Sequence, residues 1–460
     1  MDADALLREI SDYCRAVGMA ETTFGRHAVN DGKLVSRLRY GRRIRAATLN
    51  KVRHYISQHP PAVAGRSVVA DANPGPATIL PAPPPENAQR NFRFFDNRQK
   101  YLLFVNTCSE KTVIADRVAL ELGNLNPSPP ALRVFDAGIG DGTVLSKVMR
   151  AMHARFPTVP FYFVGKEISM EDVRLALEHL PDRLYEHPAT VVVLTNMYYT
   201  EAPWLTVRSL SAARSMAWHE VALTGNSSHD FGQQITNLGP FLAENWRTGA
   251  SAKTGNPIYE RPAVLVLYRE DQRFLLDRVI PKRESVAADY DLVIASQPYR
   301  ARSPVDFKAR RVVAPLARAL GPGGRLIGIH SSGGDPGSEI VQSVWPGDDP
   351  FKTNRHDLLK AVKAELGADG RDLNFNAYSD ARSIFRYDMH TLPSEVSASI
   401  GTSTLFAAWN AAIYVNQVED ERLAEVVKDG RYMEATRAVL HRHNGLWFND
   451  ESYVISRRRR

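Results

Sequence analysis

The stretch VFDAGIGDGTVLSKVMRAM, residues 134–152, determines the fold class of this 460-residue chain. An apolar run ends in Asp136, and three glycines follow at alternate positions, Gly138, Gly140 and Gly142. From Thr143 onward, apolar residues recur with the spacing of a helix. Glycine adopts backbone conformations closed to other residues and lets the main chain approach a ligand closely. The stretch therefore predicts a strand that turns sharply into a helix, with a ligand against the turn.

Strand-like and helix-like patterns alternate along the chain around this turn. The predicted strands cover residues 132–138, 160–167, 189–197, 289–298 and 324–332. The predicted helices between them cover residues 142–156, 169–180 and 305–320. Apolar strands that alternate with helices form parallel sheets covered on both faces. We therefore expect an α/β fold with a Rossmann-like, mostly parallel sheet and helices on both faces.

Residues 199–288, between the third and fourth predicted strands, are too many for one crossover helix and predict an insertion. Within them, residues 263–281 predict a β-hairpin that turns at Glu270-Asp271-Gln272. Near the C-terminus, residues 404–418 and 446–456 predict further strands, and residues 420–427 and 433–443 predict helices. An insertion near the carboxyl ends of strands often shapes a substrate pocket.

A proline-rich segment separates two parts of the chain. Residues 60–92 hold eight of the 28 prolines, and such a segment has little to bury. We expect a linker there, between a small all-α domain at residues 1–59 and an α/β domain at residues 93–460.

The first 59 residues predict a series of short helices, the last of them capped by Thr48. Two of these helices flank a polar turn at Asn30-Asp31-Gly32, an arrangement that resembles the repressor-like helix-turn-helix families. Cations lie on and just after the second helix, where they could meet phosphates: Lys33, Arg37, Arg39, Arg42 and Arg43. The resemblance implies DNA as a partner through residues 20–45. The alternative is a helical bundle with a solvated basic face that docks onto a protein.

The composition is that of a globular protein with no membrane partner. Hydrophobic residues make up 44% of the chain, and no apolar run approaches the ~20 residues that span a bilayer. Cys14 and Cys108 match no zinc or disulfide pattern, and the acidic N-terminus lacks the features of a signal peptide. We expect a cytoplasmic protein without a metal site. The formal net charge of +7 permits a polyanionic partner.

The glycine turn distinguishes two classes of nucleotide ligand. The dinucleotide fingerprint G-x-G-x-x-G, started at Gly138, would need its last glycine where Thr143 stands. The turn DAGIGDG, residues 136–142, instead matches D-x-G-x-G-x-G at every specified position. In this it resembles the class I S-adenosylmethionine-dependent methyltransferases, and the resemblance extends over about residues 93–330.

The resemblance implies S-adenosyl-L-methionine as the cofactor and assigns its binding residues. Glu167, at the end of the second predicted strand, would hold the ribose hydroxyls through charge-assisted hydrogen bonds. Asn196 and Met197, after the third strand, would lie beside adenine. The implied cofactor-binding set is Asp136, Gly138, Gly140, Gly142, Glu167, Asn196 and Met197.

The fourth strand leads into Ser296-Gln297-Pro298-Tyr299, which resembles the acceptor loop of amino-directed methyltransferases. There the first residue accepts hydrogen bonds from the target amine, and the aromatic stacks on a planar substrate. Gln297 replaces the first proline of that pattern, so a nitrogen target does not follow. His330, at the end of the fifth strand, is a candidate base for an acceptor that holds its proton. Ser296, Tyr299 and His330 are thus the candidate catalytic residues.

The favoured function is methyl transfer from S-adenosylmethionine to an acceptor that the sequence does not identify. One alternative is a DNA-base methyltransferase guided by the N-terminal domain, which would require an extruded base. Another is a DNA-binding regulator whose α/β domain only senses a nucleoside ligand. A nicotinamide-dependent oxidoreductase is disfavoured by the glycine spacing.

Overall fold

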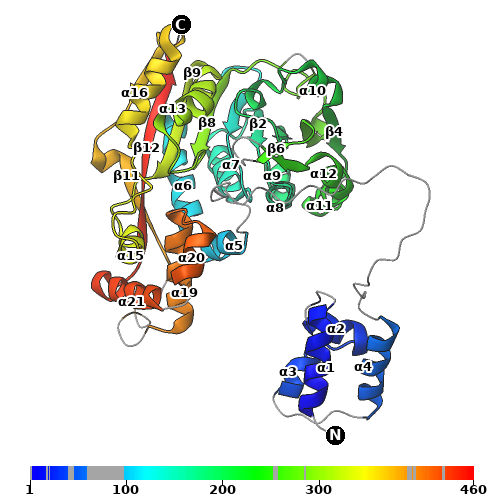
Figure 1. The fold of residues 1–460 in the computed structure, drawn as a ribbon. Coiled ribbons are helices and arrows are strands. Elements are labelled where there is room, and N and C mark those ends of the chain that lie inside the picture. Colours follow the sequence, from blue (N-terminus) through cyan, green and yellow to red (C-terminus); the bar gives the residue numbers. More distant parts are fainter. Residues whose placement is uncertain are drawn as a thin grey trace, which may run out of the picture. The chain divides into compact units, whose positions relative to one another are not determined.

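The computed structural model describes residues 3–16, 19, 21–39, 46–59, 98–251, 257–283, 286–390, 396, 400–426 and 430–459. The chain divides into two compact units, Met1–Glu86 and Asn87–Arg460 (Figure 1). The predicted linker at residues 60–92 lies outside the described residues.

The first unit contains four helices in its described part. They are α1 (Ala3–Ala16), α2 (Glu21–Val29), α3 (Leu34–Arg39) and α4 (Ala46–Gln58). Their apolar faces meet in a small core that includes Ile10, Phe24, Val35 and Val52. The predicted cap at Thr48 is wrong, because α4 begins at Ala46 and Thr48 lies inside it.

The second unit is built on one large sheet. Its strands are β1 (Leu132–Asp136), β2 (Phe161–Lys166), β3 (Thr190–Thr195), β4 (Ala217–Leu223), β7 (Ala263–Arg269), β8 (Tyr290–Ser296), β9 (Leu320–Ser331), β10 (Leu373–Asn376), β11 (Ile384–Asp388) and β12 (Trp447–Arg457). They lie in the order β10-β12-β9-β8-β1-β2-β3-β7-β4, and β11 pairs with β12. A separate two-stranded sheet joins β5 (Thr248–Ala250) to β6 (Pro257–Tyr259).

The five central strands are parallel and doubly wound. From β1, the chain adds β2 and β3 on one side and β8 and β9 on the other, each pair parallel. The order therefore reverses between β1 and β8, which is where ligands bind in open α/β sheets. β12 is antiparallel to β9, and β7 is antiparallel to β3, so the large sheet is mostly but not entirely parallel.

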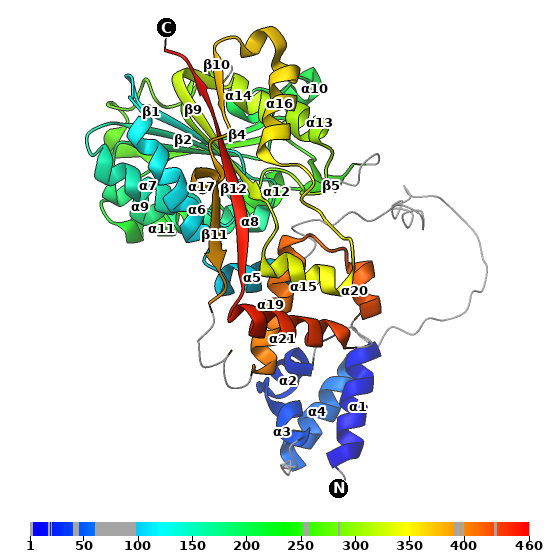
Figure 2. The same ribbon diagram turned by 90° about the vertical axis from the view of Figure 1, so that its left-hand side faces the viewer.

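Helices cover both faces of the sheet (Figures 1 and 2). One face is covered by α6 (Glu110–Ala119), α7 (Thr143–Arg155), α8 (Met170–Glu178), α9 (Leu180–Glu186), α11 (Ser228–Thr236) and α12 (Gly239–Asn245). The other is covered by η2 (Ala202–Trp204), α13 (Val305–Lys308), the π turn η4 (Ala309–Val313), α14 (Ala314–Arg318) and α16 (Arg355–Leu366). The mostly parallel sheet with helices on both faces that the sequence predicts is thus present.

A third apolar cluster joins helices that are distant in the sequence (Figure 2). It contains α5 (Arg98–Thr107), α15 (Pro336–Val344), α19 (Thr402–Val415), α20 (Asp420–Val426) and α21 (Arg431–His443). The remaining short elements are η1 (Leu120–Asn124), α10 (Leu210–Ser215), η3 (Glu270–Gln272), η5 (Gly367–Gly370) and α17 (Asp380–Ser383).

Two predicted elements are wrong. The predicted strand at residues 404–418 is mostly the helix α19, whose alanines favour helix and whose apolar residues are buried on most sides. The predicted hairpin at residues 263–281 is a single strand, β7, followed by short helical turns. β7 finds its partners in β3, antiparallel, and in β4, parallel, so it needs no local hairpin partner.

Candidate functional site

The three glycines of the turn after β1 have three different environments. Gly142 is the N-cap of α7 at φ +81°, and a Cβ there would lie 2.6 Å from the Cα of Ala176 in α8. Gly140 has φ +51°, a conformation that side chains rarely adopt. A Cβ on Gly138 would meet no atom within 4 Å. Gly142 is therefore needed for packing and Gly140 for the turn, while the edge at Gly138 is open.

Two carboxylates lie against this turn. Asp136 Oδ1 accepts a hydrogen bond from the Gly138 N–H at 3.1 Å. Glu167 Oε2 accepts one from the Gly140 N–H at 3.0 Å, and its Oε1 accepts from the N–H groups of Ile168 and Ser169. Three of the roughly four acceptor positions of the Glu167 carboxylate are thus filled, and the position left open lies on Oε2.

Burial makes both carboxylates hard to ionise. Burial, reinforced by the charge of Glu167, raises the pKa of Asp136 to about 7, although the Gly138 N–H and Lys111 oppose the shift. Burial likewise raises the pKa of Glu167, against the opposing charge of Lys166. A positive charge bound at this turn would stabilise the ionised form of both groups.

The side chain of Asn196 holds two strands of the sheet together. Its side chain is 1% exposed and joins the end of β3 to the start of β7. Asn196 Oδ1 accepts the Ala263 N–H at 2.8 Å, and Nδ2 donates to the carbonyls of Arg261 (2.8 Å) and Asn245 (3.3 Å). Both donors of the amide are thus occupied by backbone carbonyls, and the place of Asn196 beside adenine stays a prediction. Met197 is fully buried in the core.

The predicted acceptor loop follows β8, which ends at Ser296. Gln297 has φ +46° and donates its N–H to the Ile329 carbonyl at 2.9 Å. Its amide bridges to the ends of β9 and β12, because Nε2 donates to Ser331 Oγ and to the Asp450 carboxylate at 3.1 to 3.3 Å. A proline could make none of these contacts, which explains why the pattern departs at this residue.

Tyr299 and His330, predicted separately, are in direct contact. Tyr299 Oη and His330 Nδ1 are 2.5 Å apart, and His330 Nε2 lies 2.7 Å from Glu451 Oε1. Arg355 holds the same carboxylate through its backbone N–H (2.7 Å) and Nη1 (2.8 Å). Sequence reasoning missed Glu451 and Arg355, because no local pattern marks a carboxylate that meets a histidine only across two paired strands.

Tyr199 connects the glycine turn to the acceptor loop. Its Oη donates to the Pro298 carbonyl at 2.8 Å, and the ammonium group of Lys166 lies 5.0 Å from the centre of its ring. Burial, together with the charges of Glu167 and Asp136, raises the pKa of its phenol. The aromatic cluster after the third strand is visible in the sequence, but only the fold shows which of its members faces the site.

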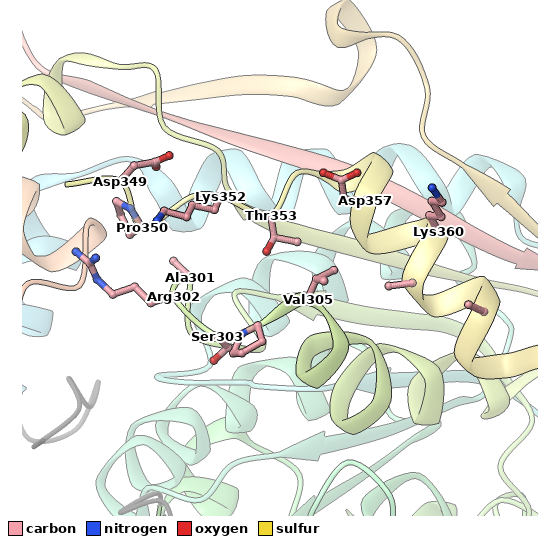
Figure 3. Close-up of a pocket in the computed structure, with 13 residues that line it drawn as sticks. Ala301, Arg302, Ser303, Val305, Asp349, Pro350, Lys352, Thr353, Asp357 and Lys360 are labelled. Carbon is pink, nitrogen blue, oxygen red and sulfur yellow. The ribbon is translucent and has the colours of Figure 1, made fainter. Parts of the chain in front are cut away.

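A cavity of about 710 Å³ lies beside the acceptor loop (Figure 3). Its walls come from residues 301–305, from residues 349–353 and from one side of α16. A much smaller cavity, lined by Gln297, Tyr299, Lys308, His330 and Ser331, shares Ala301 and Thr353 with it. A third cavity, of about 520 Å³, borders the residues that follow Glu167 and includes Trp246, whose Nε1 donates to the Glu167 carbonyl.

The predicted DNA-contacting residues are only partly described. Arg37 forms an ion pair with Asp31, and this hydrogen bond lowers the pKa of Asp31. Lys33 donates its backbone N–H to the same carboxylate at 3.0 Å. Arg39 ends α3, while Arg42 and Arg43 lie outside the described residues.

The described part of the chain places no group of three or more His, Cys, Asp or Glu side chains to bind a metal ion. No helix within the described ranges combines the length and the apolar character that crossing a membrane requires.

Comparison with known proteins gives only loose likenesses. No family model and no curated protein matches the chain. Among solved structures it is similar to a geranyl diphosphate methyltransferase in complex with GPP and sinefungin, at 13% identity over 75% of this chain and 78% of that one, with a TM-score of 0.29. It is also similar to PKMT2 from Rickettsia typhi, at 9% identity and a TM-score of 0.26. The structure of PKMT2 from Rickettsia typhi in complex with AdoHcy matches at 12% identity and a TM-score of 0.23.

The alignments cover 74% and 75% of this chain but 52% of each PKMT2 chain, so the chain spans about half of their length. At these TM-scores the likeness carries no weight for the function, which depends on the chain's own residues.

Proposed function

We propose that this protein is an S-adenosylmethionine-dependent methyltransferase. The observation that carries the proposal is the turn at the switch point of the sheet, where the open edge at Gly138 lies beside the buried carboxyl of Asp136 and the half-buried carboxyl of Glu167. A ligand bound there meets bare main chain and two carboxyl groups, whose ionised forms a bound positive charge would stabilise.

These residues fit a cationic nucleoside better than a dinucleotide. Dinucleotide-binding folds also carry an acid at the end of the second strand, where it holds the ribose, so Glu167 suits either ligand. Asp136 lies against the turn itself, where it would repel the anionic pyrophosphate of NAD. The sulfonium and ammonium groups of S-adenosylmethionine are positive and would be attracted. Glu167 Oε2, with its open acceptor position, would take a ribose hydroxyl, and Asp136 would hold the turn in place. The bound cofactor supplies an activated methyl group, and the protein supplies alignment with the acceptor.

A substitution at Gly138 tests the proposed cofactor site. Gly138→Val places methyl groups in the open space beside the turn without a backbone penalty, because Gly138 has no positive φ. We expect the variant to keep its unfolding temperature and to lose at least tenfold in affinity for S-adenosylmethionine, measured by isothermal titration calorimetry. Gly239→Val is the matched control, since a Cβ at Gly239 also meets no atom within 4 Å, and it should bind normally.

The wild-type protein should be stabilised against heat by S-adenosylmethionine and not by NAD, because a ligand that binds only the folded state raises stability. Stabilisation by NAD alone would contradict the proposal. Radiolabelled methyl transfer to small molecules, protein or DNA then separates an enzyme from a regulator that only senses the nucleoside.

A further inference from the structure

A buried chain of hydrogen bonds starts at Tyr299 and runs away from the acceptor loop. His330 on β9 and Glu451 on β12 are direct cross-strand partners, and both are less than 5% exposed. Tyr299 reaches His330 Nδ1, Glu451 reaches His330 Nε2, and Arg355 at the start of α16 reaches Glu451. We refer to Tyr299, His330, Glu451 and Arg355 as the relay.

The contacts of Glu451 fix the proton that it shares with His330. Arg355 donates to Glu451 through two N–H groups, and with His330 it holds the pKa of this carboxyl below its usual range, although burial opposes the shift. An ionised carboxylate only accepts hydrogen bonds. His330 Nε2 must therefore carry the proton that it donates to Glu451. In a neutral imidazole this leaves Nδ1 as an acceptor for the Tyr299 hydroxyl.

Tyr299 and His330 lie at a small cavity that adjoins a much larger one. Tyr299 and His330 line the small cavity that shares Ala301 and Thr353 with the cavity of about 710 Å³. A volume of that size accommodates a small organic molecule. Two further side chains pack beside the relay. The Lys308 ammonium donates to the Ala301 carbonyl at 2.8 Å, and burial lowers the pKa of Lys308 to about 8. The Tyr453 ring packs 5.9 Å from the imidazole.

We propose, on the basis of the methyltransferase function above, that the acceptor is a small molecule with an alcohol or phenol hydroxyl, bound in the 710 Å³ cavity, and that the relay removes the hydroxyl proton. A neutral amine can attack a methyl group with its lone pair before it loses a proton. A hydroxyl is a weak nucleophile until a base takes its proton. A base held this firmly beside the cavity therefore fits an oxygen acceptor.

The proton and electron balance of the step is complete. The acceptor hydroxyl donates to Tyr299 Oη while the Tyr299 proton passes to His330 Nδ1, and the imidazolium formed is stabilised by Glu451. The acceptor oxygen bonds to the methyl carbon, and the electron pair of the broken carbon–sulfur bond stays on sulfur. Tyr299 and His330 are catalytic residues, and Glu451 and Arg355 are positioning residues.

The test uses the full chain with [methyl-¹⁴C]S-adenosylmethionine and matched pairs of probes. Each pair contains a hydroxyl compound and its amine analogue: phenol with aniline, 4-hydroxybenzoate with 4-aminobenzoate, and benzyl alcohol with benzylamine. Duplex DNA is included as a further acceptor. We expect label in the hydroxyl compound of at least one pair and little in its amine.

Variants of the relay should lower kcat without weakening cofactor binding. Tyr299→Phe and His330→Gln should each reduce kcat about 100-fold, the range of a general base, with KM for S-adenosylmethionine within twofold. Two substitutions outside the relay serve as matched controls. Tyr198→Phe alters a tyrosine that is 37% exposed, and His443→Gln alters a second His–Glu pair, 2.6 Å from Glu339. Both controls should keep wild-type kcat.

Glu451→Gln tests the positioning role by a signal other than rate. ¹⁵N NMR of histidine-labelled protein should show His330 protonated at Nε2 in the wild type and a mixture of tautomers in the variant. An unchanged tautomer in Glu451→Gln would overturn the positioning role.

The possible results separate this inference from the proposed function. Label in DNA or only in amines, no label in any hydroxyl probe, or full kcat in Tyr299→Phe would overturn the inference while cofactor binding stands. Failure to bind S-adenosylmethionine would overturn both.

Discussion

Asp136 gives the glycine turn a pH-dependent stability. Its pKa rises from an ordinary value of 3.8 to about 7 in the folded chain, mainly through burial. Between those values the folded state keeps a proton that the unfolded state has lost, so stability falls as pH rises and levels off above about pH 7. Asparagine at this position does not titrate, so Asp136→Asn removes the fall in stability with rising pH. The amide oxygen of the new side chain can still accept the hydrogen bond from the Gly138 N–H.

We therefore expect Asp136→Asn to raise the free energy of unfolding at pH 8 relative to the wild type, by up to about 4 kcal/mol, and to raise it less at pH 5. Urea unfolding of both proteins at the two pH values measures the difference. An equal effect at pH 5 and pH 8 would show that the carboxyl does not titrate between them.

Gln297 shows why one residue of the acceptor loop departs from the methyltransferase pattern. Its φ of +46° is closed to proline, and its N–H donates to the Ile329 carbonyl. Gln297→Pro, which restores the pattern, should therefore destabilise the chain by about 3 kcal/mol or more. Gln297→Gly accepts the positive φ and loses only the amide contacts, so it should destabilise less. Equal unfolding midpoints for the two variants in urea would refute this account.

At the scale of elements, the sequence predicts the five central strands because each is an apolar run bounded by turn residues. It also places the predicted cofactor acids correctly at strand ends, since Asp136 ends β1 and Glu167 follows β2. It misjudges α19, because an apolar run buried on most sides has no periodicity that separates helix from strand. The contact between His330 and Glu451 depends on which strand lies beside β9, and sequence order does not give that neighbour.

The junction between β3 and β7 provides a test at this scale. Asn196→Ala removes three hydrogen bonds and leaves the Ala263 N–H and two carbonyls without a partner side chain. We expect a loss of about 2–4 kcal/mol in the free energy of unfolding, with affinity for S-adenosylmethionine within twofold of wild type below the unfolding temperature. The exposed Asn226→Ala is the control and should change neither quantity. A tenfold loss of affinity in Asn196→Ala would instead place its amide at the cofactor, as the resemblance implies.

At the scale of the whole molecule, the chain combines two units with different surfaces. The α/β unit presents a cofactor turn with two carboxylates, while the first unit carries the predicted basic helix-turn-helix face at residues 20–45. Arg37 is paired with Asp31. Contacts of the cations with phosphates would be sensitive to salt and insensitive to sequence.

For the first unit we predict an affinity for DNA that depends on salt and is lost when this unit is removed. If the basic face binds DNA, the full-length protein should bind a duplex with an affinity that falls steeply between about 50 and about 200 mM salt, because each neutralised phosphate releases a counterion. A chain of residues 87–460 should lose most of this affinity and keep its binding of S-adenosylmethionine, since the α/β unit is compact by itself. Fluorescence anisotropy with a labelled duplex measures the first quantity and calorimetry the second. If the shortened chain keeps both the affinity and the salt slope, the basic face at residues 20–45 does not bind DNA, and docking onto a protein becomes the better interpretation of its charge.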